Sequence, residues 1–268
     1  MSQTVLVFDS GVGGLSIARC IRQRLPSVNL DFLADTEFFP YGDRDHEEII
    51  ARCCELIARR LSDQPAAAVV VACNTASTVA LPALRERLSI PVVGVVPAIK
   101  PAARLSATRQ IGLLATPATI RRPYIDQLVS EFAPHCHLTR IGDGRLVHWI
   151  ENWARGSELP EADLSAVLEP FRASQVDTVV LGCTHYPLIA QTLAALLPQV
   201  LHWVDSGEAI ARRVEHLLFT EGVATVQESD EPAQCPGSLV LSFTGQSPAS
   251  LQLLLSRAGL AVSESEAR

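Results

Sequence analysis

The stretch VVVACNTAST (69–78) decides the fold class. A short apolar run ends in a small residue and a cysteine, and a helical pattern begins directly after them. The later stretch TVVLGCTHYPL (178–188) has the same layout. Short Val-rich runs that alternate with helices predict a parallel sheet covered by helices on both faces. The chain therefore holds two strand–cysteine–helix units of one α/β type.

The same alternation extends outward from both stretches. Apolar runs predict strands at 4–9, 28–35, 66–73, 90–96, 109–116, 176–183, 200–205 and, as a late edge strand, 238–245. Helical spacing predicts helices at 14–25, 45–61, 75–88, 117–132, 145–155, 162–173, 187–197, 207–219 and 247–260. The polar segment 221–237 is expected to be a loop, and the last residues, 263–268, are expected to fray.

The repeated unit predicts two similar domains. The segment from Asp9 to Cys73 is close in length to that from Thr116 to Cys183. We expect a pseudo-symmetric pair of α/β domains, each with a mostly parallel sheet flanked by helices. The expected boundaries are 1–96 with 207–268 for the first domain and 97–206 for the second. Because open α/β sheets bind ligands at the carboxyl ends of their strands, we expect an active site in the cleft between the domains, with one thiol on each side.

Composition narrows the class of protein. The formal net charge is −7 and the basic residues are scattered, which argues against nucleic acid or an anionic membrane as the main partner. No apolar stretch approaches the roughly 18 residues of a membrane span, and the start MSQTVLVFDSG lacks the basic region of a signal peptide. Seven cysteines without a regular framework fit a reduced pool. We expect a cytoplasmic protein, for which assembly as a homodimer stays open.

The sequence disfavours two classes of cofactor. Lys100 is the only lysine, so it alone could form the Schiff base of pyridoxal phosphate, and no glycine-rich phosphate cradle lies nearby. His135, Cys136 and His137 are adjacent residues on an expected short loop, and no acidic or cysteine partner for a tetrahedral metal site is evident. We therefore expect neither an organic cofactor nor a metal ion.

Cys73 and Cys183 differ from the other five cysteines, which stand in helix patterns or loops and are interpreted as structural. A free cysteine is often a small buried hydrophobe, and a single one would be interpreted in that way. Each of these two, however, ends a strand and opens a turn rich in hydrogen-bond donors, where a helix N-terminus favours the thiolate. An arrangement that occurs twice points to function.

Two thiols on opposite sides of one substrate suit a two-base proton transfer. One thiolate takes the α-proton from one face, the other thiol donates a proton to the opposite face, and the stereocentre inverts. A thiol pKa of about 8.5 needs only modest tuning for either role near neutral pH. These residues therefore predict a cofactor-independent amino-acid racemase.

Neighbouring polar residues are candidates for assisting roles. Asp9 could orient Cys73 and accept the substrate ammonium, although capping of the following helix is an alternative explanation. His185 could assist Cys183. Glu151 lies in the helix pattern HWIENW, where a solvated helix face explains it equally well. Donors for the substrate carboxylates are expected at helix N-termini, in residues 9–11, 74–75 and 184–185.

The chain resembles the glutamate racemase family of the aspartate/glutamate racemase superfamily. The matching stretches are FDSGVGGLSI (8–17), ADTEFFPYGDR (34–44), VVACNTAS (70–77), GVVPAIKPA (94–102), LLATPATI (113–120), LGCTHYPL (181–188) and VDSGEAIA (204–211). They span nearly the whole chain in the family's order, and the pair ACNTAS with GCTHYPL is highly specific. Many members carry a Cys-Pro stretch before the helix that holds the glutamate, whereas this chain reads HLTRIGDGRLVHWIENW (137–153).

The resemblance implies a cofactor-free interconversion of L- and D-glutamate that supplies D-glutamate for peptidoglycan, and hence a role in cell-wall biogenesis and cell shape. It implies that Cys73 deprotonates D-glutamate and that Cys183 deprotonates L-glutamate. The implied assisting acid/base groups are Asp9, His185 and Glu151. The implied substrate contacts are Asp9, Ser10, Tyr41, Gly42, Asn74, Thr75, Thr184 and His185.

Three other interpretations stay open at the level of the residues. One is another superfamily enzyme that decarboxylates through a single cysteine or acts on aspartate, whose missing methylene is worth only about 1–3 kcal/mol in a simple pocket. A second is a non-catalytic amino-acid sensor, which needs no pair of thiols. A third is a hydrolase built on Cys183 and His185, which leaves Cys73 without a role.

Some members of the family carry an N-terminal extension linked to activation by a cell-wall precursor. This chain begins directly at its first strand, so we expect no activation by such a precursor. A large rate increase on adding the precursor would contradict this expectation.

Overall fold

The computed structural model describes residues 3–219 and 236–260. The predicted loop at 221–237 falls almost entirely outside these residues, as does the predicted frayed segment 263–268. The chain divides into two compact units, residues 1–95 with 207–268 (unit 1) and residues 96–206 (unit 2). In the described ranges, every helix is too short or too polar to cross a membrane.

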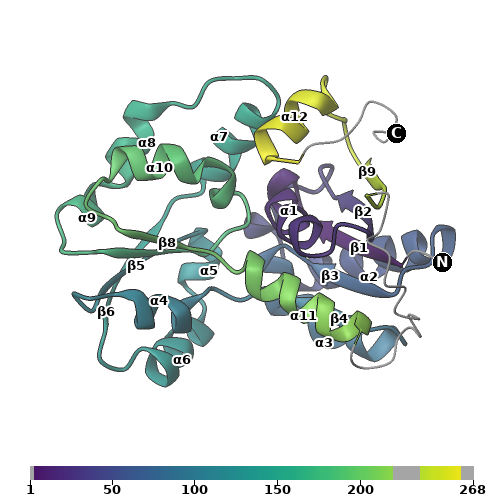
Figure 1. The fold of residues 1–268 in the computed structure, drawn as a ribbon, viewed down its shortest axis with the longest axis horizontal. Coiled ribbons are helices and arrows are strands. Elements are labelled where there is room, and N and C mark those ends of the chain that lie inside the picture. The colour runs from purple at the N-terminus through teal and green to yellow at the C-terminus, as the bar shows by residue number, and fades with distance from the viewer. Residues whose placement is uncertain (1–2, 220–235, 261–268) are drawn as a thin grey trace. The chain divides into compact units, whose positions relative to one another are not determined.

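Unit 1 is built on a five-stranded sheet in the order β4-β3-β1-β2-β9, with every pair parallel. Its strands are β1 (Thr4–Asp9), β2 (Asn29–Ala34), β3 (Ala68–Val71), β4 (Val92–Gly94) and β9 (Leu239–Phe243). Its helical elements are η1 (Val12–Gly14), α1 (Leu15–Arg24), η2 (Tyr41–Asp43), α2 (His46–Asp63), α3 (Asn74–Arg87), α11 (Gly207–Phe219) and α12 (Leu251–Ala258). The predicted late edge strand is β9, which pairs with β2 (Figure 1).

Unit 2 has a four-stranded parallel sheet in the order β6-β5-β7-β8. Its strands are β5 (Gln110–Ala115), β6 (His137–Gly142), β7 (Thr178–Leu181) and β8 (His202–Val204). Its helical elements are α4 (Ile99–Leu105), α5 (Pro117–Ile120), α6 (Pro123–Phe132), α7 (Arg145–Ala154), α8 (Glu161–Val167), α9 (Glu169–Arg172), η3 (Tyr186–Ile189) and α10 (Ala190–Leu196).

The two sheets repeat one strand order. Taken from the opposite edge, β8-β7-β5-β6 in unit 2 corresponds to β4-β3-β1-β2 in unit 1. The strand before Cys183 therefore holds the same position in its sheet as the strand before Cys73. The predicted fold class, an α/β protein with two similar parallel sheets flanked by helices, is confirmed.

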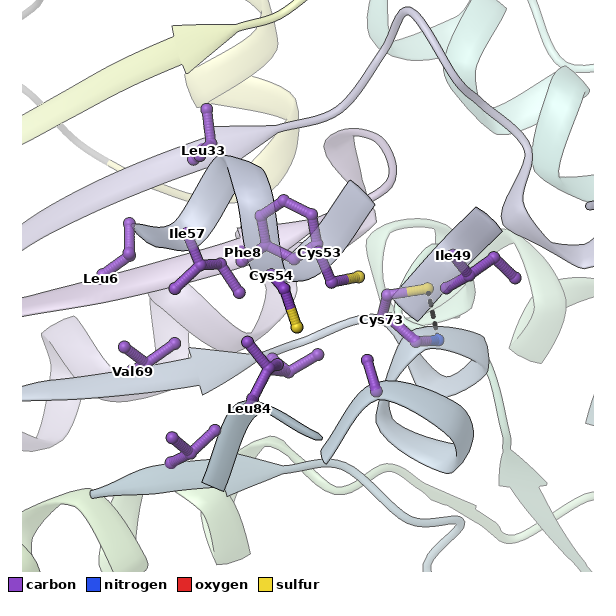
Figure 2. Packing of buried hydrophobic residues seen from close by; sticks show 14 of the residues in the cluster. Leu6, Phe8, Leu33, Ile49, Cys53, Cys54, Ile57, Val69, Cys73 and Leu84 are labelled. Atoms are coloured by element: carbon purple, nitrogen blue, oxygen red, sulfur yellow. Dashed lines mark hydrogen bonds between the residues drawn. The ribbon is translucent and has the colours of Figure 1, made fainter. Parts of the chain in front are cut away.

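The strands read as continuous apolar runs because their residues are buried on both faces of the sheet. Every residue of β3 and of β7 is buried. Figure 2 shows one of these faces in unit 1, where Ile57 of α2 and Leu84 of α3 pack in one cluster with Leu6 and Val69 of the sheet. A strand in such an interior shows no alternation of polar and apolar residues.

Prolines divide two of the predicted helices. The helix expected at 117–132 is α5 followed by α6, because Pro123 begins a new helix at its first position. The helix expected at 162–173 is α8 followed by α9, and Pro170 stands at the start of α9. Two further elements, α4 and β6, are not predicted from the sequence. The residues of β6 are mostly exposed or half-buried, so the strand carries no apolar run.

Asp177 ties the loop after α4 to the beginning of β7. Its buried carboxylate accepts hydrogen bonds from Ser106 Oγ at 2.6 Å and from the backbone N–H groups of Ala107 and Thr108, both at 2.8 Å. Thr178 Oγ1 donates another hydrogen bond at 2.9 Å. Burial raises the pKa of this carboxyl, but the donors outweigh burial and lower the pKa to about 2.

Replacing Asp177 by asparagine is expected to lower the free energy of unfolding by about 2 kcal/mol at pH 7, since each pKa unit corresponds to about 1.4 kcal/mol. Because the pKa is lowered in the folded protein, this stabilisation is present above the pKa of the unfolded carboxyl and is lost as the pH falls toward 2. Urea denaturation at pH 7 and pH 3 measures both effects. The exposed Asp163→Asn in α8 is the control, and an equal loss at both pH values would contradict the assignment.

Candidate active site

The cysteine of unit 1 stands where β3 passes into α3. Cys73 is the N-cap of α3, and its sulfur accepts a hydrogen bond from the backbone N–H of Ala76 at 3.5 Å. This contact is the dashed line in Figure 2. The unpaired N–H groups and the positive end of the helix dipole favour negative charge at this position. Such an environment stabilises a thiolate.

The carboxyl end of β1 lies beside Cys73, because β1 pairs with β3. Ser10 Oγ is 3.6 Å from Cys73 Sγ and donates to Asp9 Oδ1 at 3.3 Å. Asp9 Oδ1 also accepts from the backbone N–H of Gly11 at 3.0 Å, so the carboxylate closes the turn before η1 and reaches Ser10 at the same time. A Cβ added at Gly14 would lie 2.8 Å from Asp9 Cβ, so a side chain there would displace this carboxylate.

Asn74 and Thr75 form the first turn of α3, and both are buried. Asn74 Oδ1 has no hydrogen-bond partner among the described residues. A buried acceptor without a partner is costly in free energy, and a donor such as an ammonium group would remove that cost. Asn74 therefore fits its predicted role as a substrate contact.

The side chain of Tyr41 is buried in the interior of unit 1. Its ring packs near Phe8, and its hydroxyl donates to Asp35 at 2.8 Å. Asp35 also accepts hydrogen bonds from Arg52 Nε and Nη2, at 2.9 and 2.8 Å, and from Thr244 Oγ1 at 2.6 Å. Burial raises the pKa of Asp35, but these donors reverse the shift and hold the pKa below its ordinary value.

Asp35 is a residue that the sequence analysis misses. Asp35 directly follows β2, which pairs with β1. Its position at the carboxyl end of a strand next to that of Asp9 could have marked it as a candidate site residue. By holding the Tyr41 hydroxyl, Asp35 fixes η2 and with it the backbone at Gly42. Because the Tyr41 hydroxyl is already bonded to Asp35, only the backbone of Tyr41 and Gly42 is available to contact a substrate.

The cysteine of unit 2 follows β7 in the same way. The backbone N–H of Gly182 donates to Leu114 O at 2.8 Å. A Cβ at Gly182 would lie 2.9 Å from Leu113 Cδ1, so glycine permits the close approach of β7 to β5. Cys183 then opens a turn into the 3-10 segment η3, and the helix predicted at 187–197 becomes α-helical only from Ala190.

Cys183, His185 and Glu151 form a buried chain of polar contacts. Cys183 Sγ is 3.6 Å from His185 Nδ1, and His185 Nε2 is 2.8 Å from Glu151 Oε1. Glu151 reaches this turn because α7 packs against η3. All three residues are buried, as is Thr184 between them, so the alternative of a solvated position for Glu151 is wrong.

The partners of His185 favour its protonated form. Burial alone would lower the pKa of this imidazole, because it penalises the charged ring. The contacts with Cys183 and Glu151 oppose burial and hold the pKa above its ordinary value. A protonated His185 is a donor to Cys183 and therefore stabilises its thiolate.

Lys100 and the triplet at 135–137, which were considered for cofactor or metal binding, have surroundings that explain them structurally. Lys100 Nζ lies over the ring of Phe132, 4.9 Å from the ring centroid. Among residues 3–219 and 236–260, no group of three His, Cys, Asp or Glu side chains is arranged to hold a metal ion. His137 lies in β6 and not on a short loop, which corrects the expected setting of the triplet at 135–137.

Known proteins similar to this chain agree with the chemistry that its geometry suggests. Residues 15–214 match the family model described as Asp/Glu/Hydantoin racemase. The chain belongs to this family. A glutamate racemase from Shewanella sp. (strain MR-7) is 50% identical to this racemase over 229 residues, which are 85% of this chain and 84% of that protein.

Solved structures resemble this racemase over almost its full length. The crystal structure of Escherichia coli glutamate racemase, in complex with L-glutamate and the activator UDP-MurNAc-ala, is 42% identical with a TM-score of 0.85, and the match covers 97% of this chain and 96% of that one. A glutamate racemase isoform from Bacillus anthracis is 30% identical with a TM-score of 0.76, covering 91% and 89%. The predicted enzyme class, a racemase among the isomerases, is confirmed.

Proposed function

We propose that this racemase interconverts L- and D-glutamate by a two-base proton transfer between Cys73 and Cys183. The observation that carries the proposal is that two equivalent strand ends each hold a buried thiol linked to its own ionisable group, directly at Cys183 and through one serine at Cys73. Cys73 is linked through Ser10 to Asp9, and Cys183 contacts His185. Glutamate is the substrate named for relatives that are 47–50% identical to this chain.

In the forward direction, the Cys183 thiolate removes the α-proton of L-glutamate and the Cys73 thiol delivers a proton to the opposite face. The reverse reaction exchanges the two roles. The assignment of Cys183 to the L-enantiomer follows the family resemblance. The start of α3 stabilises the Cys73 thiolate, and the imidazolium of His185 stabilises the Cys183 thiolate. Each thiolate is therefore placed where a base requires it, and the conjugate thiol is the acid of the opposite direction.

The proposed substrate contacts are short polar groups and backbone donors at the strand ends that hold the two cysteines. Asp9 suits the ammonium group, as does Asn74 Oδ1, which lacks a partner in the part of the chain that the structure describes, and N–H groups at the start of α3 suit a carboxylate. The proposed contacts are Asp9, Ser10, Tyr41, Gly42, Asn74, Thr75, Thr184 and His185. Asp9, His185 and Glu151 are the proposed assisting groups.

The product, D-glutamate, gives the enzyme its place in peptidoglycan synthesis. The net charge of −7 and the free thiols fit a cytoplasmic enzyme that acts on a small molecule and not on nucleic acid or membranes. Assembly as a homodimer stays a prediction that sedimentation velocity tests. The E. coli relative was crystallised with the activator UDP-MurNAc-ala, and rates with and without such a precursor decide whether this racemase responds to one.

Incubation with L-glutamate in deuterated water, without pyridoxal phosphate, tests the two-base proposal. We expect loss of optical rotation and early D-glutamate that carries deuterium, while the remaining L-glutamate stays unlabelled. A single shared base would instead label both enantiomers from the start. Aspartate, measured in parallel, is expected to react roughly 10- to 200-fold more slowly, the discrimination that one methylene provides. Exchange with aspartate alone would change the assigned substrate from glutamate to aspartate.

A further inference from the structure

Tyr186 is a buried polar residue that the proposed mechanism leaves unused. It begins η3, three residues after Cys183, and its side chain is completely buried. Its hydroxyl has no hydrogen-bond partner among the described residues. A buried donor without a partner is unfavourable, so such a group calls for a partner in another state of the molecule.

The local backbone brings Tyr186 close to Cys183. The N–H of Tyr186 donates to Cys183 O at 3.2 Å, and the N–H of Leu188 donates to His185 O at 3.1 Å. The first of these bonds closes a single turn, which brings the backbone of Tyr186 back beside that of Cys183, and the second continues into η3. Burial raises the pKa of Tyr186, and the negative charges of Cys183 and Asp143 raise it further.

We propose that Tyr186 is a positioning residue whose hydroxyl donates a hydrogen bond to Cys183 when that thiol is ionised. The inference rests on the proposed role of Cys183 as an acid/base group. In the thiol form the sulfur requires no further donor, and the phenol is left without a partner. In the thiolate form the sulfur is a charged acceptor, and the phenol O–H satisfies it. The phenol stays protonated throughout and only orients its hydrogen.

Other ionisable groups face Cys183 from the elements packed around it. His185 contacts it from the same turn. On α7, Glu151 contacts His185, and Arg155 Nε lies 4.0 Å from Glu151. Asp143, just before α7, is a further source of negative charge near the phenol. A Tyr186→Phe substitution leaves all of these charges in place and removes only the hydroxyl, so its effect isolates the proposed hydrogen bond.

Loss of this bond is expected to change the balance between the two directions of racemisation. L-Glutamate binds the enzyme form in which Cys183 is the thiolate, and D-glutamate binds the form in which Cys73 is the thiolate. The two enantiomers are equal in free energy, so kcat/KM must stay equal in both directions. The change therefore appears in KM and kcat separately. We expect the ratio of KM for L-glutamate to KM for D-glutamate to rise about tenfold, the effect of one hydrogen bond to a charged group.

Tyr186→Phe and the matched control Tyr124→Phe test the inference. Tyr124, in α6 of the same unit, also has a buried hydroxyl without a partner among the described residues, and burial raises its pKa to about 12. Both variants are assayed for KM and kcat in each direction, and the rate of Cys183 alkylation by iodoacetamide is followed against pH by peptide mass spectrometry. In Tyr186→Phe the alkylation rate at neutral pH is expected to fall about tenfold. In Tyr124→Phe neither quantity is expected to change.

A second measurement keeps the hydroxyl in place and does not depend on the folding of a variant. The chain has three tyrosines, so fluorine NMR of protein labelled with 3-fluorotyrosine gives few resonances. The Tyr186 resonance, assigned by its absence in Tyr186→Phe or by elimination with Tyr124→Phe and Tyr41→Phe, is expected to move with the ionisation of Cys183. A Tyr186 resonance that stays fixed through that titration would overturn the inference.

The outcomes separate this inference from the proposed function. If Cys183→Ala is inactive but Tyr186→Phe changes neither the KM ratio nor the alkylation of Cys183, the hydrogen bond is refuted and the two-thiol mechanism stands. If alkylation shifts in Tyr186→Phe but Cys183→Ala keeps full activity, the hydrogen bond is upheld and the two-thiol mechanism fails.

Discussion

Replacement of either Cys73 or Cys183 by alanine is expected to slow racemisation about 10²- to 10⁴-fold in both directions, the contribution typical of a positioned acid or base. Each thiol is the base in one direction and the acid in the other, so neither direction survives the loss of one thiol. A decarboxylase or hydrolase with a single essential cysteine would lose activity in only one of the two variants. The polarimetric rates of the two variants therefore separate these mechanisms.

The two variants are expected to differ in hydrogen exchange. Cys73→Ala keeps Cys183 as a base, so it is expected to exchange the α-proton of L-glutamate with deuterated water without inversion. Cys183→Ala is expected to exchange D-glutamate in the same way. Proton NMR of each enantiomer measures this exchange, and the opposite preference would reverse the assignment of the thiols to the two enantiomers.

Cys20→Ala in α1 and Cys136→Ala before β6 are suitable controls, because both are half-buried cysteines outside any disulfide, one in each unit. Their racemisation rates are expected to match the wild type. Circular dichroism of all four variants checks that the fold is intact. Inversion that survives in either Cys73→Ala or Cys183→Ala would sink the two-base assignment.

The fold was predictable wherever burial leaves a local trace in the sequence. β3 and β7 are buried along their whole length, so VVV and TVVL could be recognised as strands without any tertiary information. β6 is largely accessible, and its sequence HLTRIG has no apolar run to mark it. The helix expected at 117–132 is in fact two helices, because Pro123 begins a new helix. The prediction treated this proline as an interruption that one continuous helix tolerates.

The candidate site was predictable to the extent that it depends on strand ends. Asp9 ends β1 and Cys73 follows the neighbouring parallel strand β3 by two residues, so strand pairing alone brings them to the same edge of the sheet. Glu151 lies 34 residues from His185 in the chain, and the pattern HWIENW is the same for a buried and a solvated glutamate. Only the packing of α7 against η3 decides between them. The hydrogen bond from the Tyr41 hydroxyl to Asp35 is likewise a contact that no local sequence pattern reveals.

Glu151→Gln is expected to slow racemisation about 10- to 100-fold, because a hydrogen bond to a charged group is worth about 1.5–3 kcal/mol. Glutamine has nearly the same size and shape, so it fills the space beside His185. It lacks the negative charge that helps to hold the pKa of His185 above its ordinary value. With a less basic His185, the Cys183 thiolate loses part of its stabilisation, and initial rates in both directions measure the effect.

The same substitution is expected to alter how stability depends on pH. A histidine whose pKa is raised in the folded protein contributes stability that is fully present below its unfolded pKa of about 6.5. That stability is lost as the pH rises through the folded pKa. The wild type should therefore lose free energy of unfolding between pH 6 and pH 9, and Glu151→Gln should lose less of it. Urea denaturation at the two pH values measures the difference.

Glu158→Gln, an exposed change shortly after α7, is the matched control and is expected to affect neither quantity. An unchanged rate in Glu151→Gln would remove Glu151 from the assisting groups and leave His185 acting with Cys183 alone. A slower rate with an unchanged pH dependence of stability would have a different meaning. It would show that Glu151 acts by orienting the imidazole, because the charge of His185 would then not depend on the carboxylate.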